Sequence, residues 1–75
     1  MRLTFSNHAK DRMCERNISE GDVRFALSHH VERKATEKGS IRYRGPGLRG
    51  DMLKVWVESE RGSAKKIKSV TWDGR

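Results

Sequence analysis

The sequence predicts an α+β domain in which two N-terminal helices pack on one face of an antiparallel sheet, in the order β-α-α-β-β-β-β. Three observations predict this class. Apolar residues recur at helical spacing in the first third of the chain, alternate at strand spacing further on, and are separated there by short glycine-containing turns. Helices that precede such a run of strands cover one face of the sheet. We expect one domain spanning residues 1–75.

A short strand and a helix are expected at the start of the chain. Residues 2–5, RLTF, alternate polar and apolar side chains, which is typical of a strand. Ser6 and Asn7 are both good helix N-caps, so a helix is expected over about residues 8–16. Asn17 is its expected end, because asparagine tolerates the left-handed conformation that closes helices.

The second helix has a stronger start signal. Asp22 follows Ser19 by three residues, so the two side chains can cap the free N–H groups of the first turn reciprocally. One helical face is then formed by residues at i, i+3, i+4 and i+7, namely Val23, Ala26, Leu27 and His30. Phe25 points elsewhere, either toward the first helix or toward a partner.

The rest of the chain predicts four strands with turns between them. The expected strands are residues 31–36, 41–44, 51–59 and 65–72. In the last of these, Ile67 and Val70 cannot share a face unless the strand carries a β-bulge. Trp56 and Trp72 are large candidates for the core.

The charge is positive and unevenly distributed. The net charge is +7, and residues 31–75 carry twelve Lys/Arg against six Asp/Glu. This excess favours a polyanionic partner, although a basic surface that binds nothing specific is the alternative. The single cysteine, Cys14, excludes an intramolecular disulfide, and no signal peptide or membrane span is visible. We therefore expect a cytoplasmic protein without a membrane partner.

Three polar residues of the first helix form one stripe. At 100° per residue, His8, Arg12 and Arg16 border the apolar side made by Ala9 and Met13. Two guanidinium groups one turn apart can grip phosphate, with His8 as acid or base. The alternative is structural: Arg12 pairs with Asp11 or Glu15, Arg16 pairs with Glu20, and His8 packs on the sheet.

The strands offer further candidates. Lys54 and Thr71 complete a possible catalytic set with His8, Arg12 and Arg16. Cations that alternate with aromatic residues on a solvent-facing sheet suit single-stranded RNA, and here they are Arg42, Tyr43, Arg44, Trp56, Lys66 and Lys68. The alternative is that the tryptophans complete the core and the lysines keep the sheet soluble. No histidine or cysteine spacing matches a metal site, so neither metal nor cofactor is expected.

The opening segment resembles a small bacterial domain family of uncharacterised function. Its pattern, F-S-x-H-A-x-x-R-M-x-x-R-x-I-x-x-x-x-V, is matched by Phe5, Ser6, His8, Ala9, Arg12, Met13, Arg16, Ile18 and Val23, and "SVTW" at residues 69–72 resembles the family's last strand. The layout of that family resembles RelE/ParE-like and colicin-type ribonuclease toxin folds. This resemblance implies metal-independent RNA cleavage and an acidic antitoxin as partner.

Three hypotheses therefore remain open. The first is a metal-independent endoribonuclease with the His/Arg/Lys site given above. The second is a non-catalytic nucleic-acid-binding or regulatory module, and the third is a structural or interaction domain in which His8, Arg12 and Arg16 stabilise the helix–sheet seam.

Overall fold

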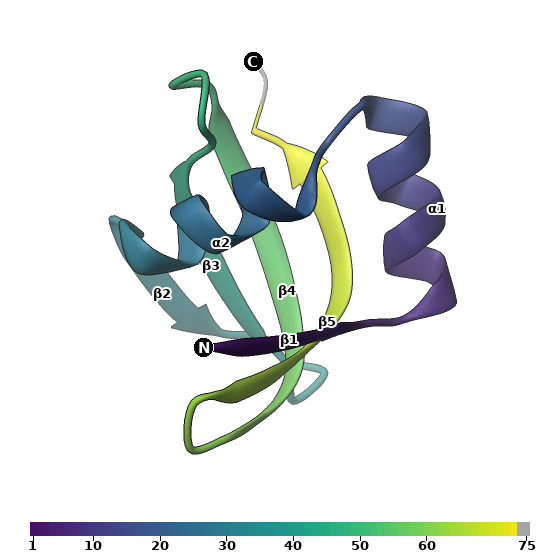
Figure 1. Cartoon of the computed structure of the whole chain (residues 1–75). Helices are drawn as coiled ribbons and strands as arrows, with labels where there is room; N and C mark the ends of the chain where they lie inside the picture. The colour runs from purple at the N-terminus through teal and green to yellow at the C-terminus, as the bar shows by residue number, and fades with distance from the viewer. Residues whose placement is uncertain (74–75) are drawn as a thin grey trace.

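Two helices and five strands are present in residues 1–73, the part of the chain that the computed structural model describes. They follow the predicted order and comprise β1 (Arg2–Phe5), α1 (Asn7–Arg16), α2 (Glu20–Ser28), β2 (Glu32–Ala35), β3 (Ile41–Pro46), β4 (Met52–Arg61) and β5 (Ala64–Trp72) (Figure 1). The α+β class is confirmed.

The sheet is mixed, which corrects the expectation of an antiparallel sheet. Its strand order is β1-β5-β4-β3-β2, and β2 to β5 form an antiparallel meander. β1 instead pairs in parallel with the first half of β5, from Arg2 opposite Ala64 to Phe5 opposite Ile67. A parallel partner needs a long connection, and the segment that contains both helices and three strands supplies it.

The predicted ends of α1 and the predicted start of α2 are confirmed. Ser6 caps α1 by accepting a hydrogen bond from the backbone N–H of Ala9 at 3.0 Å, and Asn17 closes it in the left-handed conformation with φ 57°. Ser19 and Asp22 form the reciprocal capping box of α2. α2 ends at Ser28, so the predicted helical face does not extend to residue 30.

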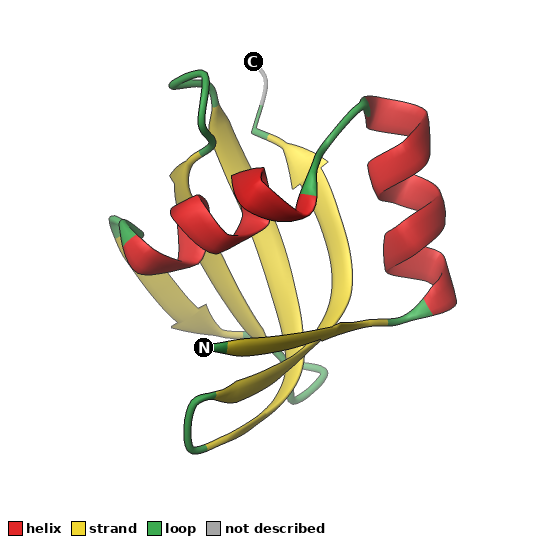
Figure 2. Cartoon of the chain, viewed as in Figure 1, coloured by secondary structure: helices red, strands yellow, loops and turns green. Residues whose placement is uncertain are grey.

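The core lies between the helices and one face of the sheet. Its fully buried side chains include Val23 of α2 and Val55 at the centre of β4. α2 crosses in front of β3 and β4 in Figure 2, and it approaches β3 so closely that a Cβ on Gly45 would lie 2.4 Å from the carbonyl oxygen of Ala26. Gly45 therefore sets the distance between the two layers.

The predicted bulge in β5 is confirmed. Trp56 is opposite Ser69 while Val57 is opposite Ile67, so β5 contains one extra residue at this point. Because of that extra residue, Ile67 and Val70 both reach the core and are fully buried.

α1 stands beside the sheet and covers part of its edge (Figure 2). β1 pairs with β5 only as far as Ile67, so beyond that point no strand of the described chain borders this edge of β5. Ser6 Oγ donates a hydrogen bond to the carbonyl oxygen of Lys68 at 3.0 Å, and Arg16 Nη1 donates to that of Val70 at 3.5 Å. The helix thus takes the place of a strand along this edge.

Within residues 1–73, neither helix has the length and apolar character needed to cross a membrane.

Candidate nucleic-acid interface

The sheet face opposite α2 presents two neighbouring rows of half-buried side chains, which we call the open face. Strand pairing aligns Arg42 of β3, Trp56 of β4 and Ser69 of β5 in the first row, and the second row consists of Arg44, Lys54 and Thr71. The aromatic ring therefore lies among cations, as the sequence predicted for Arg42, Arg44, Lys54 and Trp56. Trp56 is not a core residue, whereas Trp72 packs against the core.

Two carboxylates compensate part of this charge. Glu32 lies 3.0 Å from Arg42 and 3.6 Å from Arg44, measured between side-chain oxygen and nitrogen atoms. Asp73 lies 3.5 Å from Arg44 and 3.7 Å from Lys54. A polyanion that binds the second row must therefore compete with these carboxylates.

One donor in the first row has no partner. The Nε of Arg42 is buried, and it makes no hydrogen bond within the described part of the chain. Buried donors without partners are uncommon and expensive in folded proteins. This donor lies in the strand position opposite Trp56, and the Nη2 of the same side chain donates to Glu32 at 3.0 Å.

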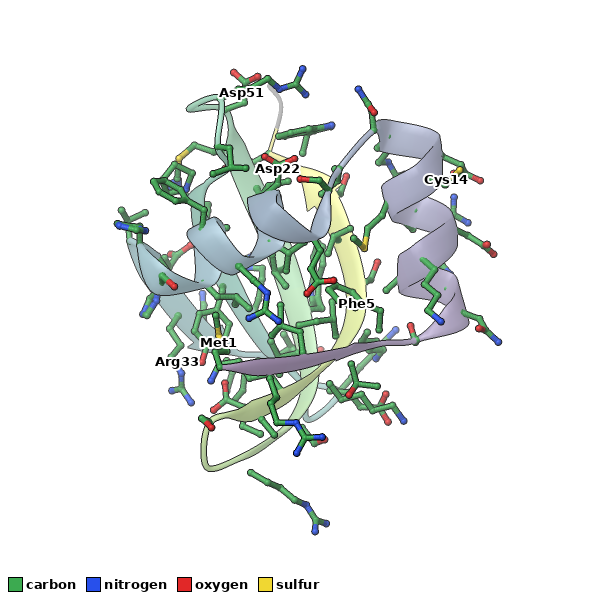
Figure 3. The ribbon with its side chains drawn as sticks, viewed as in Figure 1. Met1, Phe5, Cys14, Asp22, Arg33 and Asp51 are labelled. Carbon is green, nitrogen blue, oxygen red and sulfur yellow. The ribbon has the colours of Figure 1, made fainter. Side chains whose placement is uncertain are left out.

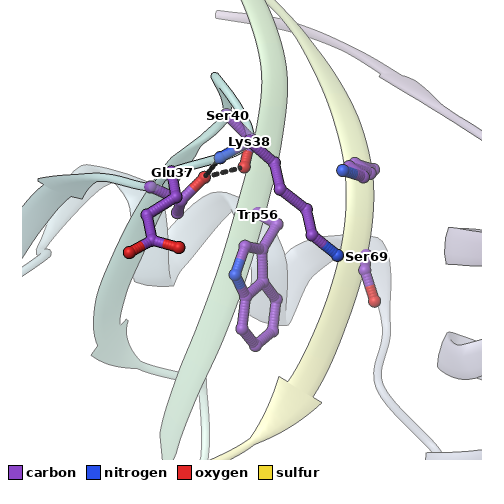
Figure 4. Close-up of a pocket in the computed structure, with 7 residues that line it drawn as sticks. Glu37, Lys38, Ser40, Trp56 and Ser69 are labelled. Atoms are coloured by element: carbon purple, nitrogen blue, oxygen red, sulfur yellow. Dashed lines mark hydrogen bonds between the residues drawn. The ribbon is translucent and has the colours of Figure 1, made fainter.

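A cavity of about 420 Å³ opens over Trp56. It lies between the indole, the β2–β3 hairpin turn and β5, and it is lined by Thr36, Glu37, Lys38, Ser40, Trp56, Lys68 and Ser69 (Figure 4). In Figure 4 the Glu37 carboxylate lies on one side of the indole and the Lys38 side chain on the other. Neither of these residues, nor Lys68, forms a salt bridge within residues 1–73. The cavity is therefore polar on opposite sides and has uncompensated cations.

The hairpin turn that carries Glu37 and Lys38 is fixed by hydrogen bonds. The hydroxyl groups of Thr36 and Ser40 are 2.8 Å apart, and the backbone N–H of Thr36 donates to the carbonyl oxygen of Ser40 at 2.9 Å. Gly39 takes the left-handed conformation that the turn needs, with φ 85°. This geometry presents both charged side chains at the cavity rim.

The stripe on α1 is only partly available to a ligand. Arg12 is paired with Glu15, which is one of the structural alternatives, and Arg16 donates to the backbone of Val70 and not to Glu20. His8 is exposed in the first turn, with no hydrogen bond or salt bridge in the described part of the chain. Arg16 therefore contacts the sheet where α1 meets β5, and the His8 side chain has no partner within residues 1–73.

The other predicted catalytic residues lie on neighbouring strands. Lys54 and Thr71 are directly opposite each other across β4 and β5. The Thr71 hydroxyl makes only a long hydrogen bond, 3.4 Å, to the carbonyl oxygen of Trp72. No contact joins this pair to His8 within residues 1–73.

Tyr43 was predicted to contact RNA, and the structure corrects this prediction. Its side chain points to the face of the sheet that α2 covers, and only 4% of the residue is exposed. The hydroxyl donates to Glu60 and accepts from Arg33 Nε at 3.0 Å, at the sheet edge where Figure 3 labels Arg33. Burial raises the pKa of Tyr43, and the bond to Glu60 adds to this rise. Tyr43 therefore links Arg33 of β2 to Glu60 of β4 on the covered face of the sheet.

Three remaining predicted residues have simple positions. Lys66 pairs with Glu58 at 3.8 Å, at some distance along β5 from the Trp56 row. Lys68, at the bulge, lines the Trp56 cavity. Cys14 is exposed on α1 and points away from the sheet in Figure 3. Within residues 1–73, no three His, Cys, Asp or Glu side chains gather as metal ligands would.

Glu37 and Lys38 are the charged cavity residues that sequence reasoning missed. They belong to "EKGS", which composition identifies only as a turn. The sequence did contain a usable signal. The turn joins two adjacent strands, and the second of them, which carries Arg42, pairs with the strand that carries Trp56, so the turn belongs near Trp56.

Comparison with known proteins gives one family. The model of a domain of unknown function, DUF4258, matches residues 5–72 and so covers both helices and nearly the whole sheet. No curated protein and no solved structure matches the chain.

Proposed function

The chain belongs to the DUF4258 family of domains of unknown function, and we propose that in this member the open face binds single-stranded RNA. The observation that carries the proposal is the half-buried Trp56, which lies in a cavity beside two lysines, Lys38 and Lys68, that form no salt bridge within residues 1–73. Unpaired bases stack on such rings, while phosphates bind the neighbouring cations.

The lysines that line the Trp56 cavity suit this function better than the cations of the second row. A phosphate near Lys38 or Lys68 displaces only water and counterions. A phosphate near Lys54 or Arg44 must also displace Asp73, which lies 3.5 to 3.7 Å from both. RNA therefore binds mainly along the first row, over Trp56 and its neighbour Arg42.

Salt dependence and two variants test the proposal. A fluorescent uridine octamer is titrated by anisotropy, in EDTA, over a series of salt concentrations. We expect affinity to fall with salt by about 0.7 log units per decade for each phosphate bound, and Trp56→Ala to weaken binding about 5- to 100-fold. Arg24→Ala is the matched control, because Arg24 pairs with Glu20 on α2 and lies away from the open face. Equal affinity of the two variants, or no binding at low salt, refutes the proposal.

A second candidate function is metal-independent RNA cleavage, as the resemblance to RelE/ParE-like and colicin-type ribonucleases implies. The observation that favours it is the pair Lys54 and Thr71, which lie opposite each other on β4 and β5. Thr71 follows Val70, which Arg16 at the end of α1 contacts, and His8 is exposed at the start of the same helix. In this reaction the 2′-oxygen attacks phosphorus and the bond to the 5′-oxygen breaks. His8 takes the 2′-hydroxyl proton or supplies one to the leaving oxygen, and Lys54 stabilises the phosphorane charge.

The same RNA distinguishes the two candidates. After incubation in EDTA, fragments that end in a cyclic phosphate indicate cleavage, and intact RNA in a salt-sensitive complex indicates binding alone. If cleavage occurs, His8→Ala should abolish it without changing the thermal unfolding midpoint. Full cleavage by this variant refutes the role of His8. An RNA-cleaving protein would also need a neutralising partner, and an acidic antitoxin that covers the open face fits its charge.

A further inference from the structure

We propose that the cavity over Trp56 is a guanine-selective subsite, in which one guanine of a bound RNA stacks on the indole and pairs with the Glu37 carboxylate. This inference rests on the proposed RNA-binding function and adds base selectivity to it. It is carried by a feature that RNA binding alone does not require, which is a carboxylate at the rim of a site for a polyanion.

The size and lining of the cavity suit one nucleotide. Its volume is about 420 Å³, which lies within the range of roughly 300–1,000 Å³ found for small-molecule sites. Trp56 supplies an aromatic surface, and Ser40 and Ser69 supply hydroxyl groups that can donate or accept. A base and its sugar fill this space, and the phosphate remains at the rim.

The position of the two lysines determines the orientation of a bound nucleotide in the cavity. Lys38 and Lys68 line the cavity, and Figure 4 shows Lys38 across the indole from Glu37. A phosphate is attracted to the lysines and repelled by the carboxylate. The base edge opposite the sugar therefore points toward Glu37.

The carboxylate then selects the base. An ionised carboxylate only accepts hydrogen bonds, and it accepts two side by side most strongly. On its Watson–Crick edge, guanine presents two adjacent donors, N1–H and N2–H. Adenine and cytosine each place an acceptor beside their single amino group, and uracil places its one N–H between two carbonyl oxygens. Glu37 thus favours guanine over the other three bases.

The carboxylate is free, and the turn that carries Glu37 is fixed by hydrogen bonds. Glu37 forms no salt bridge within residues 1–73, although Lys38 is its neighbour in the chain. The turn that carries it is closed by the bonds between Thr36 and Ser40. A site that is already formed in the free protein loses little free energy to ordering when it binds.

Single-base substitutions in RNA test this proposal. The uridine octamer is compared with the same octamer carrying guanosine, or inosine, at its fourth position. Inosine keeps N1–H and lacks the N2 amino group. We expect guanosine to raise affinity about 5- to 100-fold over uridine, with inosine between the two.

Glu37→Gln provides the protein side of the test. It should reduce the preference for guanosine to less than about twofold while leaving the affinity for the uridine octamer equal or slightly higher, because a negative charge is removed. Glu20→Gln, on the exposed surface of α2, is the matched control and should keep the full preference. Equal binding of both octamers, or an unchanged preference in Glu37→Gln, overturns the proposal and leaves RNA binding standing.

Mononucleotides separate this proposal from the proposed function. If neither octamer binds at low salt, the RNA-binding proposal fails, and guanosine and uridine monophosphates are titrated by tryptophan fluorescence with Trp56→Phe to assign the signal. Guanosine monophosphate that binds more tightly than uridine monophosphate, and loses this advantage in Glu37→Gln, supports the subsite alone. Absence of that advantage overturns it.

Discussion

The indole Nε1 of Trp72 donates a 2.8 Å hydrogen bond to the backbone carbonyl oxygen of Arg16, 56 residues earlier in the chain. Carbonyl groups in the last turn of a helix accept no hydrogen bond from within that helix. The guanidinium of the same Arg16 donates to the carbonyl oxygen of Val70, so both its backbone and its side chain contact β5. The C-terminal end of α1 is therefore fixed to the last strand.

Trp72→Phe should destabilise the fold, because it removes this donor and part of a side chain that packs against the core. We expect a loss of about 1–2 kcal/mol in the free energy of unfolding, measured by urea denaturation. Trp56→Phe is the control, since Trp56 lies on the open face, and it should cost less. Equal losses in the two variants would show that the contact with Arg16 contributes nothing.

Gly45→Ala should destabilise the fold more than Gly50→Ala. The new Cβ would lie 2.4 Å from the Ala26 carbonyl oxygen and 2.9 Å from the Cα of His30, both of them backbone atoms. We expect a loss of about 2–4 kcal/mol, read from the thermal unfolding midpoint. Gly50→Ala, whose Cβ meets open space but whose φ is 91°, should cost only about 1 kcal/mol.

Local signals explain why much of the fold was predictable. The capping box of Ser19 and Asp22, the left-handed Asn17 and the bulge that lets Ile67 and Val70 share a face are all encoded within a few residues. The parallel pairing of β1 is different. A strand of four residues has no pattern that states its direction, and its partner lies about sixty residues away.

The candidate site was predictable only in part, for a related reason. Alternation along single strands identified Trp56 and Arg42, but the predicted RNA contacts included Tyr43, which alternation places on the opposite face from Arg42. Glu37 and Lys38 reach the cavity because the hairpin turn lies over the neighbouring strands. That placement depends on strand order and sheet twist, which no local pattern contains.

Asp22 should make stability depend on pH at the acidic end. Burial alone would raise its pKa, but hydrogen bonds from Ser19 and from the Leu48 N–H outweigh burial and lower the pKa below 3.8. Its contribution is present in full above the ordinary pKa and is lost as the pH falls through the lowered folded-state value.

Asp22→Asn tests this dependence. The variant should lose about 1–2 kcal/mol near neutral pH, and the difference from the wild type should shrink at about pH 2, where the wild-type carboxyl is protonated. Urea denaturation at several pH values measures both effects. A difference that stays constant with pH would show that the carboxylate charge is not what stabilises the first turn of α2 and the loop at Leu48.

Asp73→Asn should strengthen RNA binding. Asp73 lies 3.5 Å from Arg44 and 3.7 Å from Lys54, so its carboxylate both repels phosphate and occupies two cations of the second row. The amide keeps the size of the side chain and removes the charge. We expect affinity for the uridine octamer to rise about 3- to 10-fold at low salt, with a steeper salt dependence, as one more phosphate contact forms.

The control must separate this local effect from a change in net charge. Glu20→Gln alters the net charge by the same amount, but its carboxylate pairs with Arg24 on α2 and lies away from the open face. Long-range attraction alone would raise affinity equally in both variants, and the rise would disappear above the salt concentration at which the Debye length is about 8 Å. A larger rise in Asp73→Asn that persists at such salt places phosphate against Arg44 and Lys54, whereas equal behaviour would confine the bound RNA to the Trp56 row.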